Sequence, residues 1–295
     1  MARQLFNSPE KRWLREHFWL PAMVSHKSRT TTEIKYLTFA GPEGFDVEFF
    51  SQKNIVSTSN VRVWESSSAA AAQLKQKYGP SFNVVVGEAF DLAKSTQEKS
   101  HFPHQIINLD FTNGAFHLRK PWHIPPKFET LQRVILAQRE CTESFLLLAA
   151  FAATADVDSD FGKAFVHKLA FDIATRFGHT EPLFNLTRDP QKFYPQILAS
   201  LIPCAVVRIG GEQSYDTQCL DKALYFPYNS KKTAMVCFVF LLTYDNPALS
   251  ETSHQRCDRM DKVVLKRQEE SLKIPLVEVN KILRQKSAEP RKRRS

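Results

Sequence analysis

The stretch at residues 35–50, KYLTFAGPEGFDVEFF, predicts a strand, a tight turn and a helix in direct succession. Residues 34–39 are rich in aromatic and aliphatic side chains, as a buried strand requires. The turn Gly41-Pro42-Glu43-Gly44 follows, and the chain then fits a short helix through Phe50. Small residues in such a turn let the backbone approach a ligand at the carboxyl edge of a sheet.

The alternation of strand and helix continues beyond this stretch. Further strands are predicted at residues 61–64, 82–86 and 105–109, and helices at residues 66–78 and 90–96. Apolar runs on both faces are typical of buried parallel strands that are covered by helices on both sides. We therefore predict an α/β fold with a doubly wound, mostly parallel sheet.

The second half of the chain predicts helical additions and an antiparallel hairpin. A helix at residues 130–142 precedes a fifth strand candidate at 144–152, whose alanines also allow a helix. Residues 160–203 are typical of helices in several pieces. Residues 223–228 and 233–244 then fit two strands joined by a short polar turn, which predicts a C-terminal hairpin.

Charge divides the chain into three parts. The first 30 residues carry six Lys or Arg against two acidic residues, and the last 15 carry seven against one. The residues between them hold 27 basic and 28 acidic groups, so the formal charge of +9 lies at the two ends. We predict three parts: a basic N-terminal helical extension at 1–30, an α/β domain at 31–248, and a basic helical C-terminal extension with a disordered tail at 249–295.

Acidic residues stand at the ends of three successive predicted strands. Glu65 ends the second strand, Glu88 follows the third and Asp110 ends the fourth. Glu65 comes 21 residues after Gly44, and an acidic residue at about that spacing accepts hydrogen bonds from ribose hydroxyls in dinucleotide-binding folds. Glu88 could reach an adenine amino group, and Asp110 would point across the same edge. The pattern predicts a nucleoside-binding edge.

These segments together resemble motifs one to four of class I S-adenosylmethionine-dependent methyltransferases. The nearest types are three-Cys-motif partner proteins and nucleic-acid methyltransferases. The late hairpin, ALYFPYNSKKTAMVCFVFLLTYD, resembles the antiparallel last strands of that fold, so the resemblance covers about residues 33–245. The segments that carry the resemblance are KYLTFAGPEGFDVEFF, VRVWE, VVVGEAFDLA and IINLDFTNG.

The resemblance implies a cofactor, S-adenosylmethionine, and assigns roles to particular residues. Asp110 would lie near the transferred methyl group, and Phe111 would wall the catalytic edge. The implied cofactor-binding residues are Gly41, Gly44, Glu65 and Glu88. The first strand has Thr38 where the family usually has an acidic residue, Glu43 is inserted in the first motif, and the fourth motif lacks a Pro-Pro-aromatic sequence. These departures leave the catalytic base unassigned.

Two basic regions point to nucleic acid. In the loop FTNGAFHLRKPWHIPPK, aromatic side chains alternate with cations, which suits base stacking and phosphate contact, although the aromatics could equally pack under the sheet. The C-terminal RKRRS could bind a polyanion or act only as a solubilising tail. The predicted contacts are Arg119, Lys120, Trp122, Lys127, Arg291, Lys292, Arg293 and Arg294.

Several classes of protein are disfavoured by composition. The five cysteines include no CxxC pair, and the histidines have no partners at metal-ligand spacing, so we predict neither a disulfide scaffold nor a metal site. No run of 18 apolar residues and no signal peptide is evident, so we expect a cytoplasmic protein without a membrane partner.

Three hypotheses remain open from the sequence. The first is a methyltransferase that acts on or near nucleic acid. The second is a catalytically inactive module of the same fold, which would serve as a structural or sensing subunit with a protein partner. The third is a methyltransferase for a small molecule or a protein, against which the basic ends argue only mildly.

Overall fold

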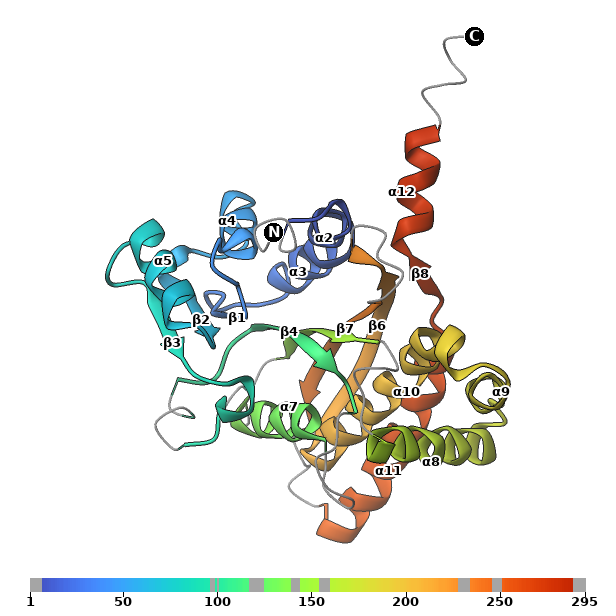
Figure 1. Ribbon diagram of the computed structural model, residues 1–295. Helices are drawn as coiled ribbons and strands as arrows, with labels where there is room; N and C mark the ends of the chain where they lie inside the picture. Colours follow the sequence, from blue (N-terminus) through green and yellow to red (C-terminus); the bar gives the residue numbers. More distant parts are fainter. Residues whose placement is uncertain are drawn as a thin grey trace.

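The computed structural model of the protein describes residues 7–95, 99, 101–116, 125–138, 144–153, 160–227, 234–245 and 251–288. Within these residues the chain forms one eight-stranded sheet with helices on both faces (Figure 1). The strands are β1 (Tyr36–Thr38), β2 (Val61–Glu65), β3 (Asn83–Val86), β4 (Ile106–Gly114), β5 (Phe145–Ala152), β6 (Tyr215–Tyr225), β7 (Met235–Tyr244) and β8 (Leu276–Glu278).

The order of the strands across the sheet is β3-β2-β1-β4-β5-β7-β6-β8. Strands β1 to β5 are parallel, whereas β7 runs antiparallel to both β5 and β6. The first five follow the doubly wound order, with the switch point between β1 and β4. The β6–β7 hairpin continues the sheet beyond β5. This topology confirms the predicted mostly parallel sheet with an antiparallel hairpin, as in the class I methyltransferase fold.

Two groups of helices cover the two faces of the sheet (Figure 1). One face carries α2 (Pro9–Trp13), η1 (Leu14–Trp19), α3 (Leu20–Lys27), α4 (Phe45–Gln52) and α5 (Ser68–Tyr78). The other carries α7 (Pro126–Ala137), α8 (Asp160–Phe177) and α10 (Pro190–Glu212). The remaining elements are η2 (Thr58–Asn60), η3 (Ala89–Asp91), α9 (Glu181–Arg188), α11 (Ser253–Lys273) and α12 (Val279–Ala288).

The N-terminal helical segment is part of the core. Its first helix begins as predicted, because the Ser8 side chain accepts a hydrogen bond from the Lys11 backbone N–H at 3.2 Å and Pro9 occupies the first turn. Leu14, Trp19 and Met23 are then fully or almost fully buried against the sheet. The segment predicted as an extension therefore packs directly on the strands.

Helix α10 is long and apolar enough to cross a membrane by length and composition. It runs through the protein with 67% of its most apolar window buried, and it contacts β6, α9 and α11. Burial in the core of the protein explains the apolar composition of α10, because a helix that is apolar on most sides is suited to a core.

Five elements differ from the predictions. Only the turn η3 forms where a helix at 90–96 was expected, because the buried Ala93 adopts a left-handed conformation (φ +57) that ends a helix. The helix predicted from residue 130 begins at Pro126, since proline suits a first helical turn. Strand β4 runs on to Gly114, beyond the predicted end at residue 109, so Asp110 lies inside the strand, whereas the strand predicted at 144–152 is confirmed as β5. Strand β6 begins at Tyr215, and β8 interrupts the predicted C-terminal helix.

Candidate functional site

The carboxyl ends of β1, β2, β3 and β4 meet at one edge of the sheet. Thr38 of β1 pairs with Val63 and with Asn108, and Glu65 pairs with Val86. Asp110 lies two residues beyond Asn108 on β4 and therefore stands at the level of Glu65. The structure thus brings the turn after β1, Glu65, the segment after β3 and Asp110 to the same edge. Their roles in binding a cofactor stay predictions.

Packing accounts for Gly44 in the turn after β1. Gly41 and Gly44 both have left-handed backbone conformations, with φ of +63 and +59. A Cβ atom on Gly44 would lie 2.9 Å from both Leu74 and Tyr78 of α5. The Tyr78 hydroxyl also donates a hydrogen bond to the Gly44 carbonyl at 3.0 Å. Gly44 is therefore required for close approach of α5, and the cofactor role of both glycines stays a prediction.

Glu65 ends β2 with a partly exposed side chain whose Oε1 atom accepts a hydrogen bond from the Ser67 backbone N–H at 3.0 Å. Ser67 is the N-cap of α5, so the carboxylate helps to satisfy the start of that helix. The second carboxylate oxygen, Oε2, accepts no hydrogen bond from any residue that the structure describes. Glu65 thus lies both at the start of α5 and at the carboxyl edge of the sheet.

Trp64 is a site residue that the sequence prediction missed. Its indole N–H donates to the Glu88 carbonyl at 3.1 Å, and a Cβ atom on Gly87 would lie 2.8 Å from its ring. The buried indole therefore fixes the backbone of the segment after β3, while the Glu88 side chain itself is exposed. A tryptophan directly before the acidic residue that ends β2 was the available signal.

Asp110 forms a buried ion pair with a residue far away in the sequence. Its Oδ2 atom accepts a hydrogen bond from the Lys11 ammonium of α2, and the two side chains are only 12% and 13% exposed. Burial by itself would lower the pKa of Lys11, but the Asp110 carboxylate outweighs this effect and holds that pKa above its ordinary value. The Asp110 charge inside β4 is therefore neutralised within the protein.

Phe111 lies on the opposite face of the sheet from this ion pair. Its ring is 3% exposed and packs against Phe39 and Phe151, with ring centroids 5.7 Å and 5.2 Å apart. Successive residues of a strand point to opposite faces, so Asp110 and Phe111 cannot both face the N-terminal helix. The predicted role of Phe111 as a wall of the site stays untested.

A second buried ion pair lies beside the first. Arg15 donates to Asp46, which is in the first turn of α4, and the two side chains are 5% and 10% exposed. The Asn108 amide donates to the other Asp46 oxygen at 3.3 Å and to the Tyr36 hydroxyl at 3.1 Å. Burial, and to a smaller extent the Asp46 charge, raise the pKa of Tyr36 well above its ordinary value. Tyr36 is therefore a neutral hydrogen-bonding group.

The predicted nucleic-acid contacts are mostly outside the described residues. Lys127 is described, and it lies half-buried in the first turn of α7. Among the described residues, no group of three His, Cys, Asp or Glu side chains is placed to hold a metal ion. The predicted contacts that the structure does not describe are Arg119, Lys120, Trp122, Arg291, Lys292, Arg293 and Arg294.

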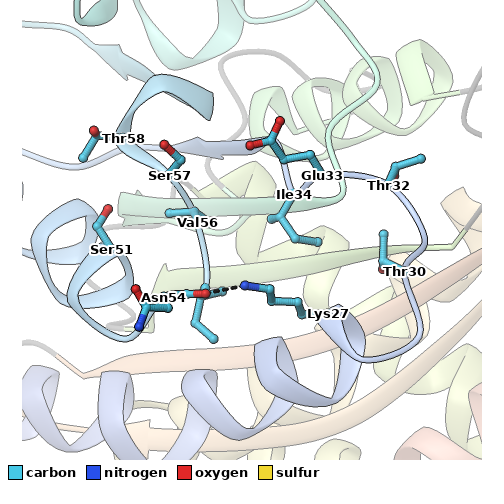
Figure 2. Close-up of a pocket in the computed structure, with 11 residues that line it drawn as sticks. Lys27, Thr30, Thr32, Glu33, Ile34, Ser51, Asn54, Val56, Ser57 and Thr58 are labelled. Atoms are coloured by element: carbon cyan, nitrogen blue, oxygen red, sulfur yellow. Dashed lines mark hydrogen bonds between the residues drawn. The ribbon is translucent and has the colours of Figure 1, made fainter.

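A cavity of about 530 Å³ lies at the other end of the strands (Figure 2). It is bounded by the end of α3, the end of α4 and the segments that lead into β1 and β2, so it opens at the amino edge of the sheet. On one side of the cavity, the Lys27 ammonium donates a hydrogen bond to the Asn54 carbonyl (Figure 2). Its lining residues include Thr30, Glu33, Ile34, Ser51, Ser57 and Thr58. Sequence reasoning did not anticipate this cavity.

No protein-family model matches the chain, and no curated protein matches it. Among solved structures, the carbon methyltransferase CurJ is 11% identical, with a TM-score of 0.43 over 82% of this chain and 57% of its own. A SAM-dependent methyltransferase from Anabaena variabilis is 12% identical, with a TM-score of 0.37 over 81% and 90% of the two chains. An rRNA methylase from Streptococcus thermophilus is 10% identical, with a TM-score of 0.34 over 76% and 96%.

The chain spans only about half to two thirds of the length of the first structures found. Identities and TM-scores this low carry no argument about ligand or activity. The assignment of the fold rests on the strand order and the reversed strand β7, and the methyltransferase names are similarities alone.

Proposed function

We propose that this protein binds S-adenosylmethionine at the carboxyl edge of its sheet and transfers the methyl group to, or close to, nucleic acid. The observation that carries the proposal is the position of Glu65, which ends β2 level with Asp110 and next to the segment that follows β3. When bound, the cofactor would supply an electrophilic methyl group, and the protein's contribution is to bind, orient and desolvate it.

The residues at this edge have the chemistry that a nucleoside needs. The Glu65 carboxylate can accept hydrogen bonds from ribose hydroxyls, and charge-assisted bonds of this kind are among the stronger ones in proteins. Trp64 holds the backbone at Gly87 and Glu88, where an adenine amino group would find acceptors. Gly41 is buried and follows β1 by three residues, next to the switch point between β1 and β4, where ligands bind in this class of sheet.

Charge supports nucleic acid as the target. The chain between the two basic ends is nearly neutral. Because Lys11 and Arg15 of the N-terminal end are held in buried ion pairs, the cations of residues 281–295 are the ones that could hold a polyanion. A basic end would add affinity for phosphates and leave recognition of the methylated group to the site itself.

Isothermal titration of the purified protein with S-adenosylmethionine and S-adenosylhomocysteine tests the cofactor half of the proposal. Binding that is lost in Glu65→Gln and kept in Glu269→Gln, an exposed residue of α11, would support it. Transfer of a radiolabelled methyl group to mixed RNA or DNA tests the second half. No heat of binding at millimolar cofactor would refute the proposal.

A second candidate function is an inactive module that serves as a structural or sensing subunit. The ion pair between Lys11 and Asp110 favours this second candidate, because the Asp110 carboxylate already has a partner within the protein. This candidate predicts no methyl transfer to any mixture of DNA, RNA and protein, while cofactor binding could persist. The radiolabel experiment therefore separates the two candidates.

A further inference from the structure

We infer that Lys11 is a positioning residue of the carboxyl-edge site, so that the N-terminal helix completes the site: Lys11 fixes Oδ2 of Asp110 and leaves Oδ1 to accept a hydrogen bond from an N–H donor of the bound ligand. This inference rests on the proposed function, because the ligand is the cofactor or its methyl acceptor. A contact between the first helix and the fourth strand thereby sets the charge and orientation of the Asp110 carboxylate inside β4.

Lys11 is held in place by the packing of its own helix. Ser8 caps α2, and the residues that follow at helical spacing, Leu14, Phe18 and Met23, are buried against the sheet. Arg15, one turn beyond Lys11, anchors the same helix to Asp46 of α4. Lys11 and Arg15, four residues apart, thus pair with carboxylates on two different elements. These two ion pairs fix the position of the N-terminal helical segment over β4.

The surroundings of Asp110 offer little else to stabilise a negative charge. In the pairing register Asp110 stands beside Ala150 of β5, which stands beside Cys237 of β7. These small side chains make room for the Lys11 ammonium above the sheet. The titratable and charged groups that interact with the Lys11–Asp110 pair are Arg15, Asp46, Tyr225 and Cys237.

Of these groups only Arg15 is a further cation, and it is engaged with Asp46. Burial, and to a smaller extent the Asp110 charge, raise the pKa values of Tyr225 and Cys237 well above their ordinary range. Both groups therefore stay neutral. Lys11 is thus the direct counter-charge of Asp110. Without it, the carboxylate would be buried beside a neutral phenol, a neutral thiol and another carboxylate, which favours protonation.

One oxygen of Asp110 is left for a ligand. Oδ1 is inaccessible to solvent and accepts no hydrogen bond from any residue that the structure describes. A buried acceptor without a donor is costly and rare in native proteins, and it is commonly satisfied by a ligand or an ordered water. An amine or amide N–H of a ligand at the carboxyl edge has the complementary chemistry.

The test compares Lys11→Met with Lys11→Arg, which keeps the charge, and with Lys273→Met, which removes the lysine of an exposed ion pair on α11. Affinity for S-adenosylhomocysteine is measured by titration calorimetry from pH 6 to pH 9, roughly the range in which an unpaired buried carboxyl would titrate. Lys11→Met should bind at least about tenfold more weakly near pH 6 and recover as the pH rises and Asp110 ionises. Lys11→Arg and Lys273→Met should keep the pH profile of the wild type.

Three outcomes overturn the inference. Wild-type affinity and pH profile in Lys11→Met would show that the pair does not act on the ligand. Equal, pH-independent losses in Lys11→Met and Lys11→Arg would show that Lys11 only supports the fold. If Lys11→Met does not fold, the neutral pair Lys11→Met with Asp110→Leu replaces it, and wild-type affinity in that double variant, which has no acceptor at position 110, would exclude Asp110 Oδ1 as the acceptor.

Failure of the proposed function is recognised separately. If the wild type binds no cofactor at all, the ¹³C chemical shift of the Asp110 carboxyl is titrated by NMR in the wild type and in Lys11→Met. An upward shift of the Asp110 pKa in the variant would keep Lys11 as the residue that holds the carboxylate charged. An unchanged Asp110 pKa would overturn the inference independently of the cofactor.

Discussion

Lys11 and Asp110 are 99 residues apart in the sequence, yet their side chains form an ion pair that is almost completely enclosed between the first helix and the fourth strand. The pair joins a segment that charge counting assigns to a basic extension with the residue that motif reasoning assigns to the catalytic edge. The N-terminal helix is therefore both part of the core and part of the candidate site.

Breaking this pair should destabilise the protein strongly. Lys11→Met leaves an uncompensated buried carboxylate, and the loss of one partner of a buried pair costs about 3–5 kcal/mol. The double variant Lys11→Met with Asp110→Asn should recover most of that loss, because the remaining amide is neutral. Urea unfolding of the single and double variants measures the difference, and additive losses would contradict the direct pairing.

Replacing Glu65 should weaken cofactor binding. Glu65→Ala removes the acceptor for two ribose hydroxyls, and we expect a loss of about 2–4 kcal/mol in binding free energy. Because Oε1 also accepts the Ser67 N–H, Glu65→Gln is the better variant: its amide oxygen can keep that bond while the charge is lost. Calorimetry should show weaker binding at an unchanged melting temperature. Full affinity in Glu65→Gln and Glu65→Ala would remove Glu65 from the site.

Alanine at Gly44 should cost more stability than alanine at Gly178. Both glycines have left-handed conformations, with φ of +59 and +66, so both substitutions carry backbone strain of about 1–2 kcal/mol. Only at Gly44 would the new methyl group collide with Leu74 and Tyr78, since nothing lies within 4 Å at Gly178. Thermal or urea unfolding of the two variants isolates the packing contribution. Equal losses of stability in the two variants would show that α5 shifts to accommodate the new methyl group without an energetic cost.

His104 should make the protein sensitive to acid. It is 3% exposed, and burial, with smaller contributions from Arg62, Lys35 and His101, lowers its pKa to about 3. The unfolded chain binds the proton near pH 6.5, so stability is full above that pH and is lost as the pH falls toward 3, by about 2 kcal/mol at pH 5. His104→Gln should flatten the pH dependence of urea unfolding, whereas the exposed His254→Gln should not. An unchanged slope in His104→Gln would contradict the burial.

Deleting residues 286–295 should weaken nucleic-acid binding uniformly. The deletion removes five positive charges and one negative charge from a chain whose centre is nearly neutral. If the tail contacts phosphates, affinity should fall for every sequence tested and the dependence of affinity on salt should become shallower. Fluorescence anisotropy with two unrelated RNA sequences measures both. An unchanged salt dependence would leave the tail as a solubilising segment.

The parts of the fold that follow local patterns could be predicted from the sequence. The end of β2 at Glu65 was placed correctly, because apolar runs and turn residues are local signals, whereas β4 runs on to Gly114 and has Asp110 inside it. The start of β6 at Tyr215 was hidden, since polar residues such as Asp216 and Gln218 alternate through it. The left-handed Ala93 was equally invisible, because tertiary packing and not propensity decides its conformation.

The parts of the candidate site that depend on distant contacts could not be predicted. Lys11 and Arg15 look like ordinary members of a basic terminus, and nothing near them in the sequence identifies Asp110 or Asp46 as partners. The packing role of Gly44 depends on Tyr78 of α5, which lies 34 residues away. Such contacts follow from how helices are placed on the sheet, and that placement is set by the whole core.

A crystal structure of the protein grown with S-adenosylhomocysteine tests the central claim most directly. The account predicts the ligand at the carboxyl edge, with its ribose hydroxyls on the Glu65 carboxylate, its adenine beside the Gly87 and Glu88 backbone, and an N–H donor within hydrogen-bonding distance of Asp110 Oδ1. A ligand in the cavity at the amino edge, beside Ser51 and Thr30, or no bound ligand at millimolar concentration, would contradict it.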